Sequence, residues 1–175
     1  ASLGLAWFAL ERFELLAGLV LALACAGNAG LAQAAERRFV PPKEARTAVL
    51  FACGVFFFSV VNGSDATVEN VLPGFVVFAA LCFLNCGFLA CWEREVDLKQ
   101  GQSSLATRKE GVNDLLRLGA VVLTLFCLWA KTPFFLGAGC VAALLIGLDF
   151  SKVAVEDKRA LADLALLAPW PFIVP

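Results

Sequence analysis

The densest group of ionisable side chains in this chain lies between residues 93 and 109, directly after a long apolar segment. Glu93 and Asp97 are four residues apart, so in a helix their carboxylates share one face. The cations close by in the sequence are Arg94, Lys99, Arg108 and Lys109. Two carboxylates with neighbouring cations can hold a divalent cation and a phosphate-bearing ligand together. The run is therefore the first candidate for a functional site.

The composition indicates that membrane-spanning helices must position this run. Hydrophobic residues make up 61% of the 175 residues, 17% are charged, and the mean hydropathy is +0.83. The charges are clumped, and the apolar stretches between them suit the hydrocarbon thickness of a bilayer, about 30 Å. We therefore expect an all-α, polytopic transmembrane bundle that forms one domain over residues 1–175. Membrane lipids are its expected surroundings, and no nucleic-acid partner is expected.

About six full spans and a partial first helix over residues 1–10 are expected. The spans are expected at residues 15–35, 47–62, 74–92, 115–131 and 134–150, with a sixth in the apolar segment that follows Arg159. Lys131-Thr132-Pro133 predicts a tight hairpin between the fourth and fifth spans. The charged region 93–114 is expected to be helical at its start and looped around Gly101 and Gly111.

Lys and Arg are divided unequally between the two sides of the predicted membrane. Twelve of the fourteen fall on one side, and only Arg12 and Lys131 fall on the other. Because cytoplasmic loops of membrane proteins collect Lys and Arg, the richer side is expected to be cytoplasmic. The acidic run lies on that side. We expect the chain to be a multi-pass integral protein of a bacterial inner membrane.

Two residue types narrow the chemistry. The chain has no His, which removes the usual neutral-pH base and the commonest metal ligand. Haem, zinc-hydrolase and Ser-His-Asp chemistry are therefore disfavoured. Seven Cys lie in apolar stretches without a Cys-x-x-Cys spacing. Cys82 and Cys86 are helically adjacent, so a thiolate pair is one interpretation, but buried free Cys more often packs as a small hydrophobic residue.

The acidic run resembles the second acidic motif of the UbiA superfamily of intramembrane prenyltransferases. The matching residues are Glu93-x-Glu95-x-Asp97, then Gly101, then Ser104-Leu105-Ala106-Thr107, without a gap. The family carries Asp-x-Glu-x-Asp, then Gly, then Thr-Leu on the cytoplasmic side after its sixth span. Glu93 stands where the family usually has Asp, and Ser104 stands where it usually has Thr. Glu36-Arg37-Arg38 is more weakly similar to the basic loop after the family's fourth span.

The resemblance implies a nine-span fold with both acidic motifs in the cytoplasm, of which this chain would hold the C-terminal two-thirds. The first acidic motif is not among these residues, so spans upstream of Ala1 are expected to carry it. The implied activity is the Mg²⁺-dependent transfer of an isoprenyl group from an isoprenyl diphosphate to an aromatic or other lipophilic acceptor. The implied roles are Mg²⁺ ligands for Glu93 and Asp97, diphosphate contacts for Arg94, Lys99 and Arg108, and a cavity-lining position for Asn85.

Other interpretations stay open beside this one. The acidic run is also typical of a solvated helix end, because charge clusters next to membrane spans are common. A non-catalytic bundle of the same architecture, used for lipid binding or complex assembly, is the alternative function. A small transporter or channel subunit is a third, disfavoured because ionisable residues within the spans are few. Glu95 points away from the face of Glu93 and Asp97 on a helix, and Asp149 is expected to flank a charged loop.

Overall fold

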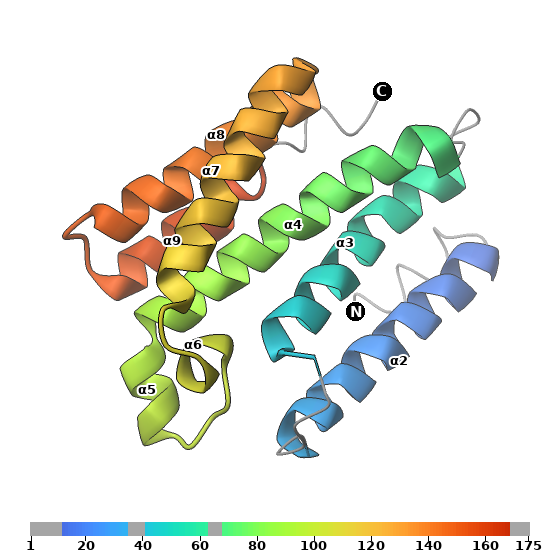
Figure 1. Ribbon diagram of the computed structural model, residues 1–175. Helices are drawn as coiled ribbons and strands as arrows, with labels where there is room; N and C mark the ends of the chain where they lie inside the picture. Colours follow the sequence, from blue (N-terminus) through green and yellow to red (C-terminus); the bar gives the residue numbers. More distant parts are fainter. Residues whose placement is uncertain (1–11, 35–40, 63–67, 169–175) are drawn as a thin grey trace. The chain divides into compact units, whose positions relative to one another are not determined.

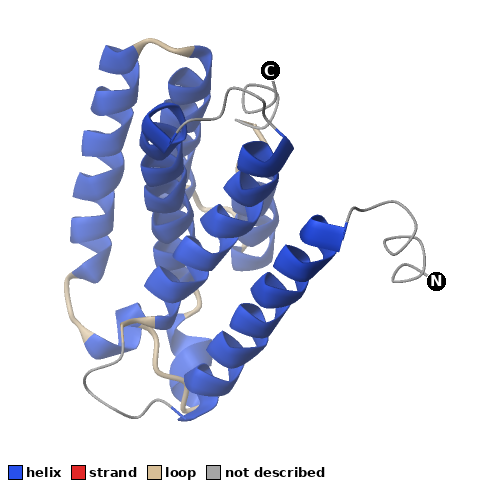
Figure 2. Cartoon of the chain, turned by 90° about the vertical axis from the view of Figure 1, so that its right-hand side faces the viewer, coloured by secondary structure: helices blue, strands red, loops and turns tan. Residues whose placement is uncertain are grey.

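The computed structural model describes residues 12–34, 41–62 and 68–168 (Figure 1). The predictions for residues 1–10 and for Glu36-Arg37-Arg38 fall outside these ranges. Within them the secondary structure is entirely helical, as predicted, and Figure 2 shows no strand. The chain divides into two compact units, residues 1–40 and 41–175, and each is considered by itself. A single membrane domain over the whole chain stays a prediction.

In the first unit the structure describes one helix, α2, from Arg12 to Ala34. Ala and Leu dominate its sequence, and both have a high helix propensity. Leu19, Val20 and Leu23 are exposed, so one stretch of this helix presents an apolar surface. α2 coincides with the predicted span at residues 15–35, which stays a prediction.

The second unit is built around one central helix. Its long helices are α3 (Lys43–Asn62), α4 (Val68–Trp92), α7 (Val112–Ala130) and α8 (Pro133–Phe150), and its short ones are α5 (Arg94–Lys99), α6 (Leu105–Arg108) and α9 (Val155–Ala165). Helix α4 packs against α3, α7 and α8 (Figure 1). The larger core includes Leu81, Phe88, Leu116 and Leu145, all nearly inaccessible to solvent. A smaller core joins α3 to α4 through Phe56.

Two helices begin earlier than the sequence predicts. Helix α3 begins at Lys43 rather than at residue 47, and the N–H of Ala45 already donates to the carbonyl of Pro42 at 3.1 Å. Helix α4 begins at Val68 rather than at residue 74 and contains Pro73. Pro73 is the sixth residue of α4, so its missing N–H removes one helical hydrogen bond, the one to the carbonyl of Glu69. The early start of α3 brings Lys43 and its neighbour into a helical turn.

Three helices in the described part are long and apolar enough to cross a membrane: α4 over Val71–Trp92, α7 and α8. They contain 22, 19 and 18 residues, which corresponds to about 27–33 Å at the rise of an α-helix. Helix α7 exposes Leu118, Leu125 and Trp129, as a lipid-facing helix does. The structure therefore indicates a membrane protein. The arrangement with six spans stays a prediction.

The sixth predicted span coincides only partly with helix α9. This helix has eleven residues and is about 16 Å long, roughly half the hydrocarbon thickness. It begins at Val155, before Arg159, after which the sequence predicts the apolar span. The helix forms there because Lys158, Ala162 and Ala165 recur at helical spacing and are buried on one face. Residues 169–175 of the predicted segment lie outside the described part.

The hairpin between α7 and α8 forms where the sequence predicts it. Lys131 adopts a left-handed conformation with φ 58° and ends α7. The Thr132 side chain then accepts a hydrogen bond from the N–H of Phe135 at 3.4 Å, and Pro133 occupies the first turn of α8, where its missing N–H costs nothing. The two helices approach closely at Gly139. A Cβ atom added there would lie only 3.0 Å from the Cβ of Cys127.

Candidate functional site

The acidic run forms a short helix at the end of α4. A single residue, Glu93, separates α4 from α5, with φ −96° and ψ 9°. The N–H of Asp97 donates to the carbonyl of Glu93 at 2.9 Å. The two residues are therefore one helical turn apart on the same face, as their spacing predicts. Asp97 is buried, whereas Glu95 is exposed.

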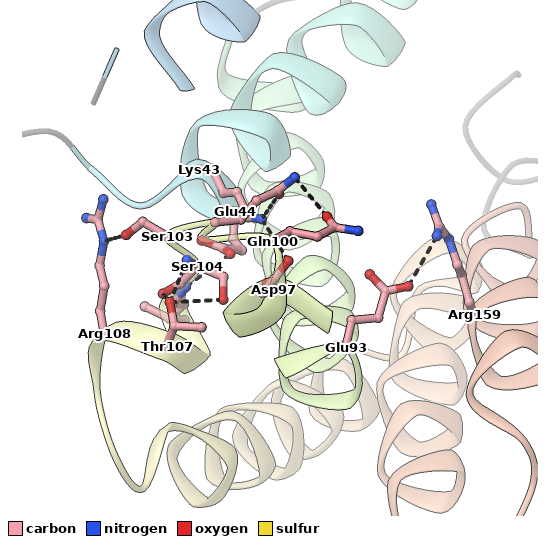
Figure 3. Close-up of polar contacts among 12 residues, drawn as sticks. Lys43, Glu44, Glu93, Asp97, Gln100, Ser103, Ser104, Thr107, Arg108 and Arg159 are labelled. Atoms are coloured by element: carbon pink, nitrogen blue, oxygen red, sulfur yellow. Dashed lines mark hydrogen bonds and ion pairs between the residues drawn. The ribbon is translucent and has the colours of Figure 1, made fainter. Parts of the chain in front are cut away.

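The two carboxylates point to different partners. Glu93 Oε1 accepts a charged hydrogen bond from Arg159 of α9 at 3.2 Å. Asp97 Oδ1 lies 3.6 Å from the Nζ of Lys43 at the start of α3. Figure 3 shows Glu93 directed toward Arg159 and Asp97 directed toward Lys43. The acidic run thus joins α3 and α9 through two ion pairs, and neither carboxylate extends alone into solvent.

The loop after α5 is held by its own backbone and side chains. Gly101 has φ 65°, a left-handed conformation that glycine adopts readily. The N–H of Gln102 then donates to the carbonyl of Asp97 at 2.8 Å. At the start of α6 the N–H of Ser104 donates to Thr107 Oγ1 at 2.8 Å, and that hydroxyl donates to the Ser104 carbonyl at 3.0 Å. The Gly-x-x-Ser-x-x-Thr segment therefore fixes the turn that connects α5 to α6.

Glu44 is a buried carboxylate that the sequence analysis did not single out. Its Oε1 accepts the N–H of Leu105 at 3.1 Å, which caps α6 from a position 61 residues away. Its Oε2 is buried and has no hydrogen-bond partner in the described part of the chain. The Pro-Pro-Lys-Glu order could have suggested a carboxylate in the first turn of a helix. Its burial was not predictable, because it depends on α6 folding back onto α3.

The predicted phosphate-binding cations do not gather on the carboxylates. Arg94 donates from Nε to the carbonyl of Ala106 at 3.1 Å. Arg108 donates from Nε to the Ser103 hydroxyl at 2.7 Å. Lys99 is exposed and has no side-chain partner among the described residues. The cations that meet the carboxylates are instead Lys43 and Arg159, and neither follows from the local sequence.

Asn85, the predicted cavity residue, lies between α4 and α9. It is 2% exposed, and its Nδ2 donates to Asp163 Oδ1 at 3.2 Å. Its Oδ1 is buried and finds no partner in the described ranges. The structure thus assigns Asn85 an interhelical hydrogen bond. Its role beside an isoprenoid stays a prediction.

We call α5, the loop 100–104 and α6 the cap; Arg94 and Ala106 of the cap line one part of a cavity of about 360 Å³. Its polar wall consists of Arg94, Lys109, Glu110, Asn113 and Asp149, with Trp92 beside them. Glu93 and Asp97 are not part of this wall. The fold therefore separates Arg94 from the carboxylates next to it in the sequence.

Asp149 is the most extensively bonded carboxylate at this end of the unit. Its Oδ1 accepts the indole N–H of Trp92 at 2.9 Å, and its Oδ2 accepts Arg117 Nε at 2.7 Å and Asn113 Nδ2 at 3.3 Å. Its side chain is only 5% exposed. Asp149 lies next to the last residue of α8 and so flanks the following loop, as predicted, and its hydrogen bonds join α8 to α4 and α7.

The donor set determines whether Glu93 and Asp97 suit Mg²⁺. Both offer the carboxylate oxygens that this ion prefers. No group of three or more His, Cys, Asp or Glu is close enough to share one ion within residues 12–34, 41–62 and 68–168. Mg²⁺ often binds through one or two carboxylates together with substrate phosphates. The pair fits that mode of binding and does not by itself make a complete protein site.

Comparisons of the chain with known protein families, with curated proteins and with solved structures found no match.

Proposed function

We propose that the chain is part of a UbiA-like, Mg²⁺-dependent prenyltransferase that moves an isoprenyl group from an isoprenyl diphosphate to an aromatic or other lipophilic acceptor. The observation that supports this most is the buried Asp97 on a braced cap at the end of an apolar helix bundle. A carboxylate held there lies where a diphosphate headgroup would meet the bundle while its isoprenoid chain stays among apolar helices.

The proposed roles follow from what each side chain can offer. Glu93 and Asp97 would hold Mg²⁺, which when bound offsets negative charge on the diphosphate oxygens. Lys43 and Arg159 already lie within 4 Å of these carboxylates, so they would supply donors to the phosphate oxygens. Glu44 and the Ser104–Thr107 pair would keep the cap in position. Arg94, Lys99 and Arg108 remain proposed as outer diphosphate contacts.

We further propose that the capped end faces the cytoplasm of a bacterial inner membrane. The excess of Lys and Arg on that side supports this orientation. A donor with a water-soluble diphosphate would then enter from the cytoplasm, and a lipophilic acceptor from the bilayer.

A non-catalytic bundle is the second candidate, and a separate observation favours it. Both carboxylates are ion-paired with cations from other helices, Glu93 with Arg159 and Asp97 with Lys43. Such ion pairs can hold helices together without any metal. On this proposal the acidic run stabilises the unit and binds no diphosphate.

Binding of farnesyl diphosphate to the detergent-solubilised protein, with Mg²⁺ or with EDTA, separates the two candidates. For the enzyme, we expect Mg²⁺-dependent binding that Asp97→Asn weakens about ten- to a hundred-fold, the range for losing a charged contact. Glu95→Gln is the matched control, because Glu95 is an exposed carboxylate on the same short helix. It should bind as the wild type does.

The non-catalytic bundle predicts the opposite pattern of results. Binding would be absent or insensitive to both EDTA and Asp97→Asn, and the thermal midpoint would fall in Asp97→Asn but not in Glu95→Gln. Equal Mg²⁺-dependent binding by wild type and Asp97→Asn would remove the metal role of Asp97.

A further inference from the structure

The cavity beside the cap carries a net positive wall. Its charged residues are Arg94, Lys109, Glu110 and Asp149. Asp149 is ion-paired with Arg117, with Nε and Oδ2 2.7 Å apart. Two cations and one anion therefore remain without an opposite partner in this wall. A wall of this kind attracts an anionic group.

Several hydrogen-bond donors of this wall are unused. Arg94 engages only its Nε, with the carbonyl of Ala106, and Lys109 is exposed without a side-chain partner among the described residues. Gly111 precedes α7 with φ 72° and offers no side-chain cap. The first turn of this 19-residue helix thus keeps free N–H groups and the positive end of its dipole. Guanidinium, ammonium and helix N–H groups together suit phosphate oxygens.

The same wall also contains an unused acceptor. Asn113 Nδ2 donates to Asp149, while Asn113 Oδ1 is buried without a partner in the described part. That oxygen has almost no accessible surface, so the acceptor that an occupant of the cavity can reach is the Glu110 carboxylate. The exposed carboxylate of Glu110 lies in the same wall. The occupant should therefore carry a hydrogen-bond donor as well as a phosphate.

The surrounding surface favours a lipid. The cavity lies where α7 begins and α8 ends, and both helices are apolar enough to cross a membrane. Close to it in sequence, Leu115, Leu118 and Phe150 are 54%, 61% and 68% exposed. Trp92, a residue type enriched at membrane interfaces, lines the cavity. A headgroup bound here would leave its acyl chains beside apolar side chains.

We propose that this cavity binds the headgroup of a phospholipid whose phosphate carries an ammonium donor, the chemistry of phosphatidylethanolamine. The phosphate contacts Arg94, Lys109 and the start of α7. The ammonium group contacts the exposed carboxylate of Glu110. Arg94 is the one residue that this site shares with the proposed diphosphate contacts; the test below changes Lys109 instead, so failure of the lipid site and failure of the proposed enzyme can be distinguished.

Native mass spectrometry of the detergent-solubilised protein, titrated with phosphatidylethanolamine, tests the site. Lys109→Ala should weaken binding about five-fold, the effect of one cation near an anionic surface. The matched control is Lys152→Ala, which removes another exposed lysine from the same end of the unit but outside the cavity. It should bind as the wild type does. Since Lys109 has no side-chain partner in the described ranges, the thermal midpoint should not change in Lys109→Ala.

Two comparisons identify the ligand. Phosphatidylcholine has the phosphate but no N–H donor, so it should bind more weakly than phosphatidylethanolamine. O-phosphorylethanolamine, the soluble headgroup, should compete only in large excess over the lipid. Equal binding of the two lipids, equal effects of the two lysine variants, or competition by the soluble ester at lipid concentrations would each overturn the proposal.

Discussion

At the residue scale, the Asp149 carboxylate accepts three side-chain hydrogen bonds, all from residues distant in sequence. Its three side-chain donors come from residues 57, 36 and 32 positions away. They leave each carboxylate oxygen with at least one hydrogen bond, and the side chain is nearly buried. Removing such an acceptor leaves donors unsatisfied, which costs about 1–3 kcal/mol for a buried group.

We expect Asp149→Ala to lower the free energy of unfolding in detergent by about 2 kcal/mol, because Trp92, Asn113 and Arg117 lose their common acceptor. The fluorescence of Trp92 should change as well, since its indole N–H loses its partner. Thermal unfolding and tryptophan emission measure the two effects.

Asp114→Ala is the control for this change. Asp114 also pairs with Arg117, whose Nη1 lies 3.1 Å from Asp114 Oδ1, but the Asp114 side chain is 81% exposed. An exposed pair contributes little, so the unfolding free energy should change by less than about 0.5 kcal/mol. Equal losses in the two variants would show that burial of Asp149 has no special effect.

The acidic run shows how far residue spacing predicts a site. A four-residue separation determines that Glu93 and Asp97 share a helical face, and the backbone bond between them agrees with this. Spacing does not determine which cations approach. Lys43 and Arg159 reach these carboxylates from 54 and 66 positions away in the chain, and the nearer Arg94 turns to Ala106 instead.

At the element scale, the α7–α8 hairpin follows from local sequence. Thr132 and Pro133 are residues that begin helices well, and the small residues of α8 allow close packing. Ala138 and Gly139 are buried. The position of Gly139 over Cys127 leaves little room for a larger side chain.

We expect Gly139→Ala to lower stability by about 1–3 kcal/mol, because its new Cβ would lie 3.0 Å from the Cβ of Cys127, which cannot rotate away. Gly147→Ala on the same helix is the control, since nothing lies within 4 Å of a Cβ there. It should be neutral or slightly stabilising. Thermal unfolding in detergent measures both, and an unchanged Gly139→Ala would mean that the helices separate freely.

Helix α9 shows what average hydropathy fails to predict at this scale. An apolar segment after Arg159 suggests a span, but the described helix has only eleven residues and begins among charges. Its buried face includes Lys158, whose Nζ donates to the carbonyl of Asp149 at 3.3 Å and lies 5.4 Å from the centroid of the Trp92 ring. A lysine satisfied in this way can belong to an amphipathic helix, which average hydropathy does not detect.

At the scale of the second unit, its ionic contacts gather at one end of the long helices. Antiparallel connections bring the start of α3, the end of α4, the start of α7 and the end of α8 together. Lys43, Asp97, Arg117 and Asp149 meet partners there. Lys131 lies beyond the opposite end of α8, about 27 Å away along this helix of 18 residues.

This separation predicts the sidedness of the protein in a membrane. In a background without the seven native cysteines, Lys152→Cys should react with a membrane-impermeant maleimide only in inverted vesicles. Lys131→Cys should react only in intact cells, because the end with many cations faces the cytoplasm. Labelling of both variants in the same preparation would rule out α8 as a span.

The sequence by itself determined the helical class, the membrane character and the helical face shared by Glu93 and Asp97. These properties depend on composition, on apolar run length and on spacings of a few residues, which act locally along the chain. Only the tertiary structure decided that Lys43 and Arg159 neutralise the acidic run, that Glu44 is buried beneath α6, and that Arg94 faces a separate cavity. Each of these contacts joins helices distant in sequence, and their geometry depends on how the apolar faces pack.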